Sequence, residues 1–253
     1  MWTFAAGAKR FRAIGRRRHS ALATIQHLEG NWPKLYPYRD MANNLTAEKA
    51  LIFRITHINN VPWILRNGLH CKNSGVQDPN FVRIGNLELI QRRTARNVSV
   101  PPGGTLSDYI PFYFTPFSMM MYNIKTGYGG IRQFPNAEIV IMASSLRGLA
   151  DLGVATVFSD RHAYLQTAQF FTSLDDLDKI DWGILQRRDF KRDVDDPEKT
   201  DRYQAEALVH RHLPVEHLAG IVCLSENEKG TLERQREEVG LDLKIMARPG
   251  WYF

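Results

Sequence analysis

The chain is poor in the residues that mark several protein classes. Among its 253 residues there are two cysteines, and neither belongs to a CxxC pair or to a cysteine–histidine cluster. This argues against a disulfide scaffold or a metal site and favours a reducing, cytoplasmic setting. No run of apolar residues approaches the 18 or more of a membrane span, so we expect no membrane association.

Common signatures of nucleotide binding and hydrolysis are also missing. The sequence contains no GxGxxG, no GxxxxGK[ST] and no GxSxG, which argues against a Rossmann dinucleotide fold, a P-loop and a hydrolase nucleophile elbow. There is no internal repeat and no low-complexity linker. What remains is a chain with 43% hydrophobic residues, an ordinary value for a globular protein.

The net charge of +6 is confined to the N-terminal part. Residues 1–40 hold eight basic and two acidic residues, which accounts for the whole excess, and residues 41–253 are neutral overall. Residues 1–40 could be a nucleic-acid-binding arm, an organellar presequence, or a dispensable extension preceding a true start at Met41. We favour the last interpretation and divide the chain into an extension (1–44) and one domain (45–253).

Hydrophobic patterning becomes regular from residue 50. It predicts strands at 50–57, 109–114, 138–144, 155–159, 220–225 and 243–247, and helices at 59–68, 86–97, 118–127, 201–213 and 226–239. Strands and helices are mixed without a βαβ rhythm. We therefore expect a single α+β domain whose meandering sheet is surrounded by helices.

Charged and polar residues interrupt several of these apolar segments. Arg54 and Thr56 alternate with apolar neighbours, so both point to the same face of their strand. Glu206 stands uncrowded between two alanines on the expected 201–213 helix. Each residue taken alone is explained as an ordinary surface group. Only their occurrence together favours a functional site.

Five segments of the sequence are distinctive: "FRITHINNVPWILRNGL", "IQRRTARNVSVPPGGTLSDYIPFYFTPFSMMMYNI", "FSDRHAYLQTAQFF", "YQAEALV" and "WYF". In this order they resemble the DarT family of DNA ADP-ribosyltransferases, the toxins of DarT–DarG toxin–antitoxin systems. The resemblance runs from about residue 50 to the end. It implies an ADP-ribosyltransferase-like mixed or antiparallel β core, NAD as co-substrate without a metal, and a DarG-type macrodomain antitoxin as partner.

The resemblance also implies roles for single residues. Glu206 and Arg93 match the catalytic carboxylate and arginine. The carboxylate would stabilise the positive charge that develops on the ribose, and the guanidinium fork would hold a phosphate or the acceptor base. The NAD-binding residues implied are Arg54, Thr56, Asn60, Arg93, Tyr122 and His162. Many family members have a histidine where Arg54 stands, so the grip on NAD is expected to differ there.

The family modifies a base of single-stranded DNA, thymine in one branch and guanine in another, and we favour thymine. DNA contacts are expected from Arg92, Arg188, Arg192, Tyr203 and Gln204. Acidic residues near Arg188 and Arg192 reduce the positive electrostatic potential around them. We therefore expect DNA to bind in a narrow groove and not on a broad basic face. Two alternatives stay open: another NAD-consuming enzyme, such as an RNA 2′-phosphotransferase, and a non-catalytic nucleic-acid-binding module.

Overall fold

A computed structural model describes residues 41–253, and the three interpretations of residues 1–40 lie outside this range. Residues 41–44, which the sequence analysis placed in the extension, belong to the same compact unit as the rest of the described chain. Met41 and Leu45 are both buried, with 2% and 1% of their surface exposed.

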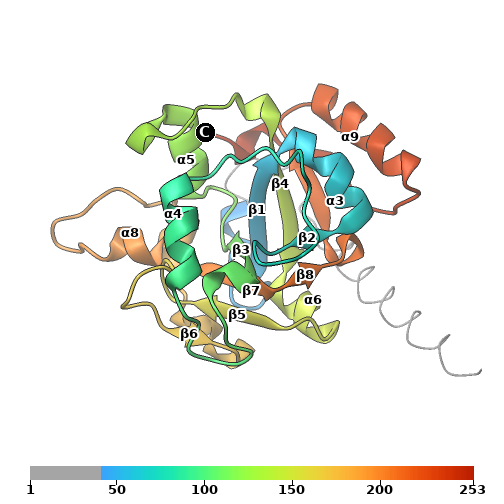
Figure 1. Cartoon of the computed structure of the whole chain (residues 1–253). Coiled ribbons are helices and arrows are strands. Elements are labelled where there is room, and N and C mark those ends of the chain that lie inside the picture. Colours follow the sequence, from blue (N-terminus) through green and yellow to red (C-terminus); the bar gives the residue numbers. More distant parts are fainter. Residues whose placement is uncertain (1–40) are drawn as a thin grey trace, which may run out of the picture. The chain divides into compact units, whose positions relative to one another are not determined.

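The described chain is built around one eight-stranded sheet (Figure 1). Neighbouring strands are antiparallel except for the parallel pair β10–β9. In spatial order the strands are β10 (Ile245–Ala247), β9 (Gly220–Cys223), β4 (Ile139–Ser145), β1 (Leu51–His57), β3 (Tyr109–Tyr113), β7 (Glu206–His210), β5 (Thr156–Ser159) and β6 (Phe170–Phe171). This mixed sheet with flanking helices confirms the predicted α+β class. Two short strands, β2 (Leu69–His70) and β8 (His212–Leu213), pair separately.

Most helices begin and end at residues with the expected local chemistry. Asn86, Ser118 and Ser225 cap the first turns of α4, α5 and α9 with their side chains, and α3 ends at Gly68, where φ is 76°. The helices are α3 (Val61–Asn67), α4 (Leu87–Arg92), α5 (Met119–Thr126), α6 (Leu146–Asp151), α7 (Trp182–Arg187), α8 (Lys199–Arg202) and α9 (Glu226–Glu238).

The predicted helix over 201–213 is wrong. Helix α8 ends at Arg202, and after a turn the chain enters β7 at Glu206. Strand β7 lies between β3 and β5 and is covered on both faces, so its residues Glu206–Val209 are all buried. A strand buried on both faces shows a continuous apolar run instead of alternation, and such a run cannot be told from a helix by periodicity.

The two central strands β1 and β3 pair over a short stretch. They share the single register pair Phe53↔Tyr113, whereas β1 and β4 are in register over all seven residues of β1. The sheet therefore opens at its centre. In the view of Figure 1, helix α4 lies to the left of β1 and β3.

Candidate active site

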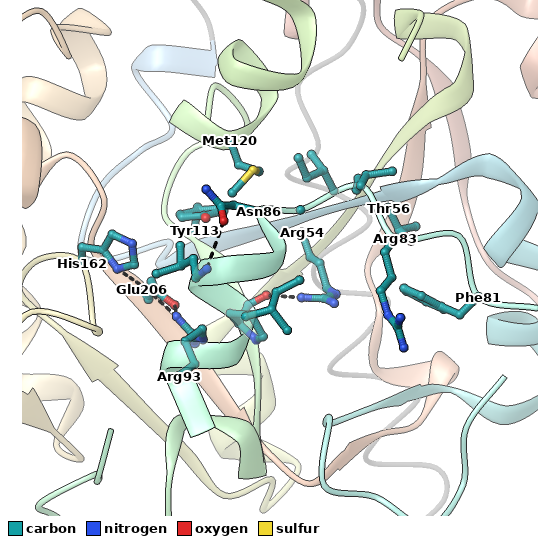
Figure 2. Close-up of a pocket in the computed structure, with 16 residues that line it drawn as sticks. Arg54, Thr56, Phe81, Arg83, Asn86, Arg93, Tyr113, Met120, His162 and Glu206 are labelled. Carbon is teal, nitrogen blue, oxygen red and sulfur yellow. Dashed lines mark hydrogen bonds and ion pairs between the residues drawn. The ribbon is translucent and has the colours of Figure 1, made fainter. Parts of the chain in front are cut away.

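A cleft lies where β1 and β3 separate, and it gathers five of the predicted site residues. Arg54 and Thr56 come from β1, and Glu206 from the first position of β7. Arg93 follows α4 in a short 3-10 turn, and His162 follows β5. Figure 2 shows Arg93 and His162 converging on Glu206, with Arg54 and Thr56 farther along the same cleft.

Glu206 is held from several sides. Its side chain is 1% exposed, and Arg93 Nη1 donates to its Oε2 at 2.9 Å and its Oε1 at 3.1 Å. His162 Nδ1 lies 3.0 Å from Oε1, and the backbone N–H of Ala163 donates to the same oxygen at 3.1 Å. In the sheet, Glu206 is in register with Tyr113 of β3. These contacts fix the carboxylate in one orientation.

The surroundings keep Glu206 ionised. Burial on its own would raise the pKa of this carboxyl, but Arg93, His162 and the Ala163 amide outweigh that effect and lower the pKa to about 2. The charged partner and the hydrogen bonds therefore prevail over desolvation. A carboxylate with so low a pKa is a poor proton acceptor and a suitable partner for positive charge that develops next to it.

Two guanidinium groups in the cleft retain unused donors. Arg54 donates from Nη1 to the Pro111 carbonyl at 2.9 Å, but its buried Nε has no hydrogen-bond partner among residues 41–253. The same holds for Nη2 of Arg93. Burial lowers the pKa of Arg54 to about 10, so it stays protonated at neutral pH. Two arginines facing one carboxylate leave a positive cleft that suits an anionic ligand.

The sequence analysis missed one wall of the cleft. Phe81, Arg83 and Asn86 line it from the segment that precedes α4, and Tyr113 and Met120 line it as well. In Figure 2, Asn86 lies beside Tyr113 and Met120, and Phe81 and Arg83 lie together at the other end. Hydrophobic periodicity carries no signal in an irregular segment, so its place could not be predicted. Tyr113 could have been suspected, because it alternates with buried residues on β3. Burial and the nearby Glu206 raise its pKa well above the ordinary value.

Two predicted NAD-binding residues do not line the cleft. Asn60 is fully buried, and its Nδ2 donates to Thr56 Oγ1 and to the Val82 carbonyl, both at 2.9 Å. Its Oδ1 accepts from the Val82 N–H at 2.8 Å. Asn60 therefore ties the segment that carries Phe81 to β1. Tyr122 is 37% exposed and packs on Phe190 and Phe253.

The five predicted DNA contacts are scattered. Arg92 is exposed beside Glu88, and Arg192 is exposed in the segment between α7 and α8. Arg188 lies over the rings of Phe117 and Phe253, at 4.0 and 4.3 Å from their centroids.

The other two predicted DNA contacts, the buried Tyr203 and the half-buried Gln204, lie deeper in the fold. Tyr203 is 1% exposed and donates its hydroxyl to the Phe117 carbonyl, and Gln204 donates to the Thr200 carbonyl. In this conformation the Tyr203 side chain has almost no surface open to a ligand. Within residues 41–253, no three His, Cys, Asp or Glu side chains gather as a metal site, and no helix could span a membrane.

A family model and individual relatives of this chain all belong to one family. The model of the family described as "ssDNA thymidine ADP-ribosyltransferase, DarT" matches residues 53–253. A DNA ADP-ribosyl transferase of Escherichia coli O127:H6 is 53% identical over 85% of this chain and 98% of its own length. Another, from Thermus sp. strain 2.9, is 33% identical over 81% of this chain and 97% of its own length.

Solved structures agree. The DarT of Thermus sp. 2.9 in complex with ADP-ribosylated single-stranded DNA superposes with a TM-score of 0.71 at 31% identity, covering 81% of this chain and 97% of that one. The same protein in complex with NAD⁺ gives the same TM-score and identity. A matching sequence over most of the chain, the shared fold and the arginine–glutamate pair in its cleft lead to one conclusion: the chain belongs to the DarT family of DNA ADP-ribosyltransferases.

Proposed function

We propose that this enzyme transfers ADP-ribose from NAD to a base of single-stranded DNA, with thymine as the acceptor. The observation that carries the proposal is the ionised, buried Glu206 held by Arg93 in a cleft that is otherwise positive. The family description and the Thermus complexes with NAD⁺ and with ADP-ribosylated single-stranded DNA support it.

The cleft fits NAD as the co-substrate. The unpartnered Nε of Arg54 and Nη2 of Arg93 are buried donors, and burying such donors is costly unless a ligand accepts from them. A dinucleotide supplies acceptors of the right kind in its diphosphate and ribose hydroxyls. Phe81, 39% exposed at the same cleft, offers a ring on which a nucleobase or the nicotinamide can stack.

The chemistry follows from the fixed charges. The bond between the nicotinamide nitrogen and ribose C1′ breaks, nicotinamide leaves with the electron pair, and C1′ becomes electron-poor. Glu206 stabilises that positive charge, and Arg93 and His162 keep its carboxylate in place. A ring nitrogen of the base then bonds to C1′ and loses its proton to solvent. No metal is needed in this scheme.

The acceptor must be an unpaired base. In a duplex the attacking ring nitrogen of thymine is hydrogen-bonded to adenine, and extruding a base costs a few kcal/mol. Exposed basic residues of the segment before Glu206, among them Arg192, are candidate contacts for the DNA backbone. We further propose that the enzyme acts in the cytoplasm as the toxin of a toxin–antitoxin pair, opposed by a macrodomain antitoxin of the DarG type.

The test is a transfer assay with labelled NAD. Each single-stranded oligonucleotide contains only one kind of candidate acceptor base, either thymine or guanine. It is compared with its duplex and with RNA of the same sequence, and the modified nucleosides are identified by mass spectrometry. The expected product is ADP-ribosyl-thymidine from single strands. Modified guanosine would point to the other branch of the family, label on RNA alone to another NAD-consuming transferase, and no label to a binding module.

A further inference from the structure

The segment 188–198 joins α7 to α8, and α8 leads into the strand that begins with Glu206. It carries three basic and five acidic residues, and the sequence analysis expected the acids to weaken its attraction for DNA. We call this segment the acceptor loop. The structure shows that four of its five acids, all except Asp195, form ion pairs with basic residues of the described chain.

One lysine binds two of these acids. Lys199, the first residue of α8, has 9% of its side chain exposed, and its Nζ lies 3.1 Å from Asp189 Oδ1 and 3.0 Å from Asp193 Oδ2. The two carboxylates come from different points of the loop, so a single nearly buried ammonium draws the loop closed. The Lys199 carbonyl also accepts from the Tyr203 N–H at 2.9 Å, which links this contact to the turn before Glu206.

Two further acids of the loop are paired in the same way. Arg202 of α8 binds Asp196 at 2.6 Å, and Arg161, next to His162, binds Glu198 at 3.1 Å. In contrast, Lys191 and Arg192 are exposed, and neither has an ion-pair partner among residues 41–253. With four acids paired, the exposed Lys191 and Arg192 outnumber the remaining acid, Asp195, so the loop presents an excess of positive charge to solvent, which suits a phosphate backbone.

The start of the loop is anchored by aromatic contacts. Phe190 packs against Tyr122 and Phe253, with ring centroids 5.4 and 5.8 Å apart, and against Tyr203 at 5.3 Å. This explains why Tyr122 and Tyr203, predicted as ligand contacts, lie away from the cleft. Both tyrosine rings pack against Phe190 of the acceptor loop. Lys199, Asp189 and Asp193 likewise do not line the cleft.

We propose that Lys199 is a positioning residue for the DNA acceptor: by binding Asp189 and Asp193 it holds the acceptor loop in the shape that receives single-stranded DNA. The inference rests on the proposed function and deepens it. Because Lys199 lies outside the cleft, its loss should impair DNA recognition and leave the use of NAD intact. Without Lys199 the acceptor loop would have to become ordered when DNA binds, and this cost would weaken the affinity for DNA.

The first experiment replaces the lysine in the full chain. Lys199→Met removes the ammonium and keeps an unbranched side chain, Lys199→Arg keeps the charge, and Lys179→Met is the control, since Lys179 pairs with Asp178 at a site with 52% of the lysine side chain exposed. KM for a thymine-containing single strand, KM for NAD and kcat are measured. We expect Lys199→Met to raise the KM for DNA about 10-fold, with the other two values within about twofold. Lys199→Arg should recover most of the loss, and Lys179→Met should behave as wild type.

A second variant separates positioning from charge and serves also if Lys199→Met does not fold. The double substitution Asp189→Asn, Asp193→Asn makes the loop more positive, so electrostatics alone would lower the KM for DNA. If Lys199 acts by holding the loop, the KM for DNA rises about threefold in spite of the added charge. Unchanged or lower DNA KM values in these variants, or an equal rise in the KM for NAD, would overturn the inference.

A binding measurement keeps this inference distinct from the proposed reaction. Fluorescence anisotropy of a labelled single strand gives a Kd for wild type and for each variant without any transfer. If the wild-type enzyme modified no DNA, the proposed function would fail. The Kd values would still show whether Lys199 organises a single-strand-binding loop, with a weaker Kd in Lys199→Met expected and an unchanged Kd contradicting it.

Discussion

A single nitrogen of Arg93, Nη1, contacts both carboxylate oxygens of Glu206, at 2.9 and 3.1 Å, across 113 residues of sequence. A fork-to-fork pair would use two nitrogens, one for each oxygen. Here Nη2 remains buried without a partner in residues 41–253. Arg93 can therefore hold the carboxylate and donate to a substrate at the same time.

Glu206→Gln should abolish most transfer while it leaves the fold and NAD binding largely intact. Glutamine keeps the shape and an acceptor oxygen but supplies no negative charge to the electron-poor ribose. We expect a loss on the order of 10²-fold or more in kcat, the scale of removing one preorganised electrostatic partner. The matched control is Glu216→Gln, an exposed carboxylate. Near wild-type transfer by Glu206→Gln would refute the role of its charge.

Arg93→Lys should rescue activity poorly. A lysine can place one ammonium near Glu206, but it cannot also supply the second donor that Nη2 of Arg93 offers to the substrate. We expect kcat/KM for NAD to fall at least about 10-fold. Arg66→Lys, at an exposed residue paired with Glu238, is the control and should behave as wild type. Equal activity of both variants would mean that the second donor is not used.

The low pKa of Glu206 predicts how stability depends on pH. The folded pKa of about 2 lies below the ordinary value of 4.5, so the folded state binds this proton less readily than the unfolded chain. The stabilisation is fully present above pH 4.5 and is lost as pH falls toward 2. Between pH 5 and pH 3 the wild type should lose about 2 kcal/mol of unfolding free energy that Glu206→Gln does not lose. Urea titrations at these pH values measure the difference, and parallel curves for the two proteins would contradict the prediction.

Asn60→Ala should weaken NAD binding, although Asn60 does not line the cleft. Removing its side chain leaves the Val82 N–H and carbonyl without partners and frees the segment that carries Phe81 and Arg83. We expect a destabilisation of about 1–3 kcal/mol and a raised KM for NAD, with the KM for DNA little changed. Asn67→Ala, at an exposed helix end, is the comparison. A change in stability alone would show that Asn60 does not position the wall of the cleft.

The sequence allowed the α+β class and most strands to be predicted, because antiparallel strands with flanking turns leave a local pattern. It also indicated Arg54 and Glu206, since a charge inside an apolar segment is visible without a structure. It failed at residues 201–213, where burial on both faces of β7 removed the alternation that marks a strand. Phe81 and Arg83 could not be predicted because they lie on an irregular segment whose position is set by the hydrogen bonds between Asn60 and Val82. The roles of Tyr122 and Lys199 depend on contacts across the fold, which no local pattern records.

The short pairing of β1 with β3 has a consequence for the whole domain. It divides the sheet into two blocks, β10-β9-β4-β1 and β3-β7-β5-β6, joined at the centre by the pair Phe53↔Tyr113. Arg54 stands on one block and Glu206 on the other, with the Arg54–Pro111 bond between them. A substrate bound in the cleft would contact residues of both blocks and so link them across the gap in backbone pairing. Substrate binding should therefore raise the free energy of unfolding of the whole domain.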